Sequence, residues 1–279
     1  MGNGSVIRRR ALGRRLRELR EAAGLTLEAA APRLDWSTST LSRIETGQQA
    51  PHVHGVRSML DLYDAGGSMW TELVAMAREV RQKGWWRGHG IGDDSYVAFE
   101  NEASSVLDYT VDYVPGLLQV PDYSRALLAA SIARRTRESV DSAVAVRAIR
   151  QRRLTSADDP LTLTAVVDES VLHRPIGGPA VLAAQRAHLV AMAAVASVTL
   201  QVLPLDVGAR ATAGSGFTVL TFGALGEPDL AYVEHALGAA LMEKADDVAS
   251  AKLKFDRLRS DALSPAGSLA LLQRVADGT

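Results

Sequence analysis

The sequence predicts two domains of different class: a small all-α domain, followed by a mixed α/β (α+β) domain. Residues 12–82 carry apolar side chains at helical spacing, interrupted by glycines and hydroxyl residues. Beyond residue 96, short alternating β-branched stretches are separated by helical ones, which is typical of a sheet covered by helices. The 279 residues are enough for two such domains. We place them at 1–66 and 96–279, joined by a linking helix and linker at 67–95.

The N-terminal helices are predicted from apolar spacing and from capping residues. The first helix has leucines at i, i+4 and i+7, namely Leu12, Leu16 and Leu19. Gly24 suits the C′ position that ends it, and Thr26 can cap the second helix. Ser37 can cap a third helix, which Gly47 ends. Two further helices are predicted at 53–63 and 68–82.

The third helix has an unusual outward face. Leu41 and Ile44 supply its buried side. The outward residues are mainly hydroxyls with one guanidinium: Thr38, Ser39, Thr40, Ser42 and Arg43. Such side chains suit hydrogen bonding to base edges and phosphates, so this helix is the candidate base-contacting surface.

The stretch 8–66 resembles the lambda-repressor-like, or Xre, helix-turn-helix family. The matching residues are Gly-Leu-Thr at 24–26, Ser-Thr-Leu-Ser-Arg-Ile-Glu-Thr-Gly at 39–47, and Pro51. The resemblance implies a transcription regulator that binds double-stranded DNA, with Thr38 and Ser39 touching bases and Arg43 also reaching DNA. Two positions depart from the family: Leu27 replaces a frequent phosphate-binding glutamine, and Ala30 replaces a larger core leucine. The alternative is a helical interaction module that binds no DNA.

The charge distribution supports DNA binding once the chain is divided. Residues 1–90 contain 14 Lys and Arg against 9 Asp and Glu, whereas the remainder contains 17 against 23. A basic N-terminal domain can hold phosphate while an acidic body stays away from it. The predicted phosphate-contacting residues are Arg8, Arg9, Arg10, Arg14, Thr26 and Ser37.

From residue 96 onward the chain resembles the uncharacterised domain that follows such modules in many actinobacterial regulators. The residues that carry the resemblance are those at 100–103, 113–119, 123–126, 167–169, 177–179, 200–204 and 262–265. The resemblance implies a regulator, often encoded beside a very small acidic partner protein. It implies no particular ligand.

In this second region the patterns predict four helices and four strands. The helices are expected at 120–133, 139–155, 179–194 and 245–262, and the strands at 161–167, 198–203, 217–222 and 230–234. In the final helix, Leu253, Phe255 and Leu258 are expected to point inward.

An enzyme is not expected. Asp168, Glu169 and His173 follow a strand and could bind a metal or move protons, but Asp168 or Glu169 can equally begin a short helix, with His173 on the surface. The sequence has no cysteine, no Walker loop, no G-x-S-x-G elbow and no dinucleotide-binding fingerprint. We therefore expect no catalytic residues, no metal and no cofactor.

A ligand or partner site is predicted at Tyr113 and Gln119, beside a Pro-Gly turn and near Glu100 and Glu102 in sequence. These residues would line a cleft under the 208–216 loop; the alternative is a packed turn that closes the core.

We expect a cytoplasmic, nucleoid-associated homodimer that does not bind membranes. Its second domain would dimerise the chain and sense a small-molecule effector or a small acidic partner protein. Alternatives are an antitoxin-like interaction protein that regulates its own synthesis, and an enzyme fused to a DNA-targeting domain.

Overall fold

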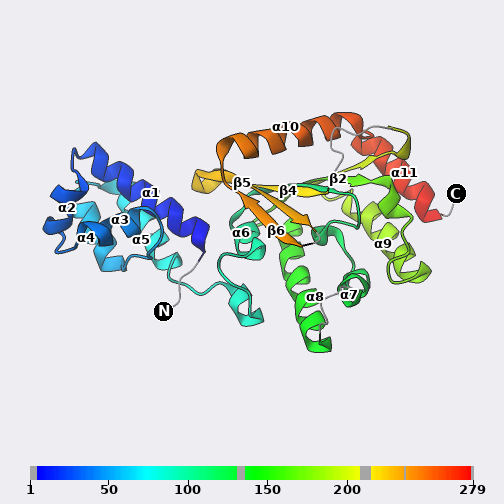
Figure 1. Ribbon diagram of the computed structural model, residues 1–279, viewed down its shortest axis with the longest axis horizontal. Helices are drawn as coiled ribbons and strands as arrows, with labels where there is room; N and C mark the ends of the chain where they lie inside the picture. Colours follow the sequence, from blue (N-terminus) through cyan, green and yellow to red (C-terminus); the bar gives the residue numbers. More distant parts are fainter. Residues whose placement is uncertain (1–4, 131–135, 208–214, 236, 278–279) are drawn as a thin grey trace. The chain divides into compact units, whose positions relative to one another are not determined.

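The computed structural model describes residues 5–130, 136–207, 215–235 and 237–277 (Figure 1). The chain divides into two compact units. The first comprises Met1–Glu102 with Gly223–Glu227, and the second comprises Ala103–Phe222 with Pro228–Thr279. The first unit is helical, and the second is a mixed sheet with helices, so the predicted fold class is confirmed. The boundaries expected at residues 66 and 95 stay predictions.

Within the described residues, the first unit contains six α-helices. They are α1 (Val6–Ala22), α2 (Leu27–Arg33), α3 (Thr38–Glu45), α4 (Val53–Leu62), α5 (Gly67–Glu79) and α6 (Tyr96–Glu102). Thr26 caps α2 and Ser37 caps α3, each by accepting a backbone N–H three residues later at 3.2 Å. Gly24 and Gly47 adopt the left-handed backbone at φ +70° and +69° that a C′ residue needs.

One hydrophobic core holds α1 to α5 together. Its fully buried members come from all five helices and include Leu12, Leu16, Ala31, Leu41, Leu60 and Leu73. Gly13 lets α1 approach the end of α3, because a Cβ there would overlap the carbonyl oxygen of Ile44. The helix predicted at 68–82 is α5, and it packs in this core with Val74 and Ala77 buried. The tight approach and the shared core fix the orientation of α3.

The second unit contains a six-stranded mixed sheet among its described residues. In space the order is β3-β2-β1-β4-β5-β6. The strands are β1 (Ser105–Thr110), β2 (Thr162–Asp168), β3 (Val198–Leu203), β4 (Phe217–Phe222), β5 (Glu227–His235) and β6 (Gly238–Met242). β1, β2 and β3 run parallel, with Asp108 beside Ala165 and Ala165 beside Leu200, whereas β1–β4 and β5–β6 pair antiparallel.

Helices cover both faces of this sheet. They are α7 (Pro121–Ala129), α8 (Arg137–Gln151), α9 (Pro179–Met192), α10 (Ala245–Asp261) and α11 (Pro265–Asp277). In Figure 1, α10 runs along one face, and α7 and α8 lie on the other. Phe255 and Leu258 of α10 pack on Tyr109 and Val166 of the sheet.

Several expectations for this unit were wrong or incomplete. Leu253 was expected to point inward, but it is 73% exposed, because it falls on the outer side of α10. The sequence patterns also missed β1, β6 and α11 of this unit, and α6 of the first unit. β1 carries Asp108 among apolar residues, and β6 is a short run of small and apolar residues on the sheet edge, so neither shows clear alternation.

Candidate nucleic-acid interface

Helix α3 presents hydroxyl and guanidinium groups to solvent. Thr38, Ser39 and Arg43 are exposed, and Thr40 and Ser42 are half-buried. Two of the exposed side chains form hydrogen bonds within the helix and its cap. The Ser39 hydroxyl lies 3.0 Å from that of Ser37, and Arg43 Nε donates to the Ser39 carbonyl at 3.2 Å. These groups can exchange their partners for base edges without uncovering the core.

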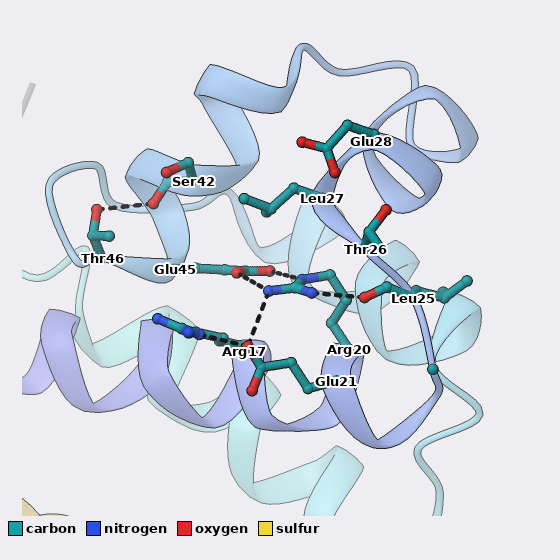
Figure 2. Close-up of a pocket in the computed structure, with 11 residues that line it drawn as sticks. Arg17, Arg20, Glu21, Leu25, Thr26, Leu27, Glu28, Ser42, Glu45 and Thr46 are labelled. Atoms are coloured by element: carbon teal, nitrogen blue, oxygen red, sulfur yellow. Dashed lines mark hydrogen bonds and ion pairs between the residues drawn. The ribbon is translucent and has the colours of Figure 1, made fainter.

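A buried ion pair fixes the inner side of α3, and the sequence patterns missed it. Arg20 is 5% exposed, and Glu45 is 6% exposed. The Arg20 guanidinium donates to both Glu45 carboxylate oxygens, at 2.7 and 2.8 Å, and to the Leu25 carbonyl at 2.6 Å (Figure 2). The two-point contact with Glu45 joins the last turn of α1 to the last turn of α3. The bond to the Leu25 carbonyl joins the same arginine to the α1–α2 turn.

Both residues of the ion pair line a hollow between the helices (Figure 2). Thr26 and Leu27, from the start of α2, line it together with Ser42 and Thr46 from the end of α3. The start of α2 and the later outward residues of α3 therefore share one surface. A signal for this arrangement was present in the sequence as an arginine ending one helix and the glutamate of the Ile-Glu-Thr-Gly string.

The tyrosine that ends α4 lies close to this ion pair. Tyr63 is 5% exposed, and its hydroxyl finds no hydrogen-bond partner among the described residues. Burial raises the pKa of Tyr63 to about 12; Glu45 adds to the rise and Arg20 opposes it.

Two of the predicted phosphate-contacting arginines make internal contacts. Arg8 donates to Glu102 Oε2 at 2.7 and 2.9 Å and also pairs with Glu79. Arg9 is 9% exposed, its Nε donates to the Gly47 carbonyl, and burial lowers its pKa. These contacts give both side chains a structural role in the first unit, and their contact with phosphate stays a prediction.

Arg14 and Arg10 lie near the carboxylate of Glu227, which belongs to the same unit. Arg14 donates to Glu227 Oε1 at 2.5 Å, and its side chain is 34% exposed. Burial raises the pKa of Glu227, and the charges of Arg14 and Arg10 oppose that rise. A phosphate could compete with this partly desolvated carboxylate for Arg14.

The other two phosphate candidates are the caps Thr26 and Ser37. Both are exposed, and each hydroxyl oxygen is the acceptor for the first turn of its helix. Both therefore lie at helix starts, where backbone N–H groups favour anions.

The segment Tyr113–Gln119 is a tightly bonded turn. Gln119 is 1% exposed. Its side-chain Nε2 donates to the Val114 backbone carbonyl at 2.7 Å, and its side-chain Oε1 accepts from the Ser124 hydroxyl at 2.8 Å. Gln185 accepts from the Val120 N–H at 2.8 Å and donates to the Leu118 carbonyl at 2.7 Å. With its polar groups bonded inside the core, Gln119 fits the packed-turn interpretation, and its place in a ligand site stays a prediction.

The other members of the predicted ligand site are separated between the units. The Tyr113 hydroxyl donates to Glu234 at 3.1 Å, and burial together with Glu234 raises the pKa of Tyr113. Glu100 is 2% exposed, and Glu102 binds Arg8; both belong to the first unit. Residues 208–214 of the expected covering loop lie outside the described residues.

A short helix begins at the acidic pair after β2, as the alternative to a metal or proton-transfer site predicted. Asp168 accepts from the Ser170 N–H at 3.0 Å and caps a 3-10 helix, Glu169–Leu172. His173 is 49% exposed and lies 3.8 Å from Glu169. Within the described ranges, no three acidic or histidine side chains are grouped so that they could hold a metal ion. None of the helices described there is long and apolar enough to span a membrane.

Comparison with known proteins agrees with this geometry. A family model described as a helix-turn-helix domain matches residues 11–73, which include most of α1, all of α2 to α4 and so the exposed face of α3. A model described as a domain of unknown function (DUF5753) matches residues 94–274, well over half of the chain. Neither the curated proteins nor the solved structures contain a match. The protein is a DNA-binding regulator of the helix-turn-helix class, and the chain belongs to the DUF5753 family.

Proposed function

We propose that the protein binds a two-fold symmetric site in double-stranded DNA as a homodimer, and that the DUF5753 domain dimerises the chain and senses a small-molecule effector or a small partner protein. The observation that carries the DNA-binding proposal is the outward face of α3. Its polar side chains are exposed while its inner side is held by a buried core and by the Arg20–Glu45 ion pair. A rigid helix with a free polar face is what reading of the major groove requires.

In this proposal Thr38, Ser39 and Arg43 contact base edges. Arg43 has the greatest reach, and a guanidinium can bind the O6 and N7 atoms of guanine together. The half-buried Thr40 and Ser42 serve the flanking contacts. The caps Thr26 and Ser37 would donate their hydroxyl hydrogens to phosphates on either side of the groove.

Dimerisation follows from the size of the reading surface. One short helix contacts only a few base pairs, which is too little to select a site in a genome. Two copies related by a two-fold axis would double the site. A change in the second domain that alters the placement of the two copies would alter DNA affinity, and DNA would alter effector affinity by the same factor.

Selection from a random DNA library tests the proposal. The full-length wild type should enrich a palindromic sequence with half-sites about one helical turn apart. Arg43→Ala should lose the preference at one position of each half-site, whereas Arg78→Ala, which removes an exposed charge on α5, should keep it. Absence of any enriched sequence would contradict sequence-specific binding. Co-purification of a small acidic protein would identify a partner for the second domain.

A further inference from the structure

One edge strand of the sheet is covered by another segment of the chain, and the other edge strand is exposed. At one edge, β3 is covered by the α10–α11 connection. The Val202 N–H donates to the buried Ser268 hydroxyl at 2.9 Å, and the Val202 carbonyl accepts from the Leu263 N–H at 2.9 Å. At the other edge, β6 has four of its five residues exposed.

The sequence of β6 contains nothing that protects this edge. Residues 237–242 read Leu-Gly-Ala-Ala-Leu-Met, without a charge or a proline. Leu237 is 94% exposed, Leu241 37% and Met242 36%. Natural sheets usually protect an edge with lysine, proline, a bulge or a covering segment, because unpaired N–H and C=O groups recruit another strand.

The hairpin geometry decides which backbone groups are available. His235 and Gly238 are register partners, as are Val233 and Ala240, and Ala231 and Met242. In an antiparallel hairpin whose closing pair is separated by two residues, the closing pair and every second pair after it exchange hydrogen bonds, so we infer such bonds for these three pairs. The alternation leaves the N–H and C=O groups of Ala239 and Leu241 directed away from β5.

We propose that β6 is the dimer interface: it pairs antiparallel with β6 of a second copy, around a two-fold axis at Ala240. In this register Leu241 lies opposite Ala239 of the second copy, and Met242 opposite Gly238, so within β6 Leu241 and Met242 each meet a small side chain. Ala239 and Leu241 exchange backbone hydrogen bonds across the axis. Glu243 meets Leu237, so no like charges are opposed. The proposal rests on the proposed homodimer and identifies the surface that forms it.

Substitutions at the edge test the interface in the full chain. Ala239→Pro removes an outward N–H without breaking a β5–β6 bond, and Leu241→Lys places a charge against the second copy. Both should raise the dimer dissociation constant at least about tenfold in sedimentation velocity, whereas Leu253→Lys on α10 should not. Circular dichroism establishes that each variant is folded; if Ala239→Pro is not, Leu241→Lys decides.

A cross-link supplies a positive result. Residues at position 240 would form a non-hydrogen-bonded pair about 4.5 Å apart at Cα, within reach of a disulfide. Since the chain has no cysteine, Ala240→Cys should yield a covalent dimer on mild oxidation, and Leu253→Cys should not. A wild-type dimer that persists in both edge variants, together with no cross-link in Ala240→Cys, overturns the interface but not dimerisation. A wild type that stays monomeric with and without DNA overturns both.

Discussion

The sequence predicts two DNA-contacting surfaces in the basic N-terminal domain: the arginines of α1 and the outward face of α3. In the structure, Arg8, Arg14, Arg15 and Arg20 each pair with a carboxylate of the same unit. Among the described residues, the exposed Ser39 and Arg43 of α3 bond locally, to their own helix and its cap. Net positive charge therefore does not measure the charge that DNA can use, because a paired arginine must exchange a carboxylate for a phosphate.

This difference assigns separate tasks to the two helices. Much of the guanidinium charge on α1 stabilises the first unit, whereas α3 keeps its polar groups available. Four predictions test the division, from the largest expected effect to the smallest.

Removing one partner of the buried ion pair should cost the most. Glu45→Ala leaves the Arg20 guanidinium buried without its carboxylate and should lower the free energy of unfolding by roughly 3–5 kcal/mol. Glu72→Ala removes an exposed partner of Arg15 and should change stability by less than about 1 kcal/mol. Chemical denaturation of both variants compares their free energies of unfolding. Equal losses would show that the buried pair stabilises the unit no more than an exposed pair does.

Removing the guanidinium of α3 should affect DNA and not stability. Arg43→Ala should weaken specific binding by about 1–3 kcal/mol, because a base contact is lost. Its unfolding midpoint should match that of the wild type, since the side chain is exposed. A variant that selects the same operator with unchanged affinity would show that Arg43 reads no base.

Salt dependence separates arginines that bind phosphate from those that bind carboxylate. If Arg10 and Arg14 contact phosphate, replacing both with alanine should flatten the slope of log affinity against log salt by roughly 0.9 for each contact. If the pairs with Glu79 and Glu102 keep Arg8 from phosphate, Arg8→Ala should reduce stability and leave the slope unchanged, whereas the predicted phosphate contact of Arg8 requires a flatter slope. A flatter slope for Arg8→Ala would return that residue to the DNA surface.

The smallest effect concerns pH. Because the folded-state pKa of Tyr63 is raised to about 12, its contribution to stability is present below pH 10 and is lost as pH rises through 12. Tyr63→Phe should keep more of its stability than the wild type in that interval. Near neutral pH it should be equal or more stable by about 1 kcal/mol, since an unbonded buried hydroxyl is removed. Identical alkaline transitions would mean that Tyr63 is solvated.

The C-terminal region shows where sequence patterns succeed. The strands expected at 161–167 and 198–203 correspond to β2 and β3, which are buried and rich in β-branched residues. The patterns failed at β6 and at Leu253, where position in the sheet or around the helix, not residue type, decides exposure. Gln119 shows the same limit: an amide is polar in any sequence, but here its side chain is bonded to Val114 and Ser124 inside the core.

The sequence by itself determined what is local. Caps at Thr26 and Ser37, left-handed glycines at Gly24 and Gly47, and the outward face of α3 depend on residues within one or two turns of each other. Only the tertiary structure decided which arginines are paired, because the partners of Arg8, Arg14 and Arg20 lie 25 to 213 positions away along the chain. It also decided which sheet edge is covered, since that depends on where the connection before α11 returns to β3.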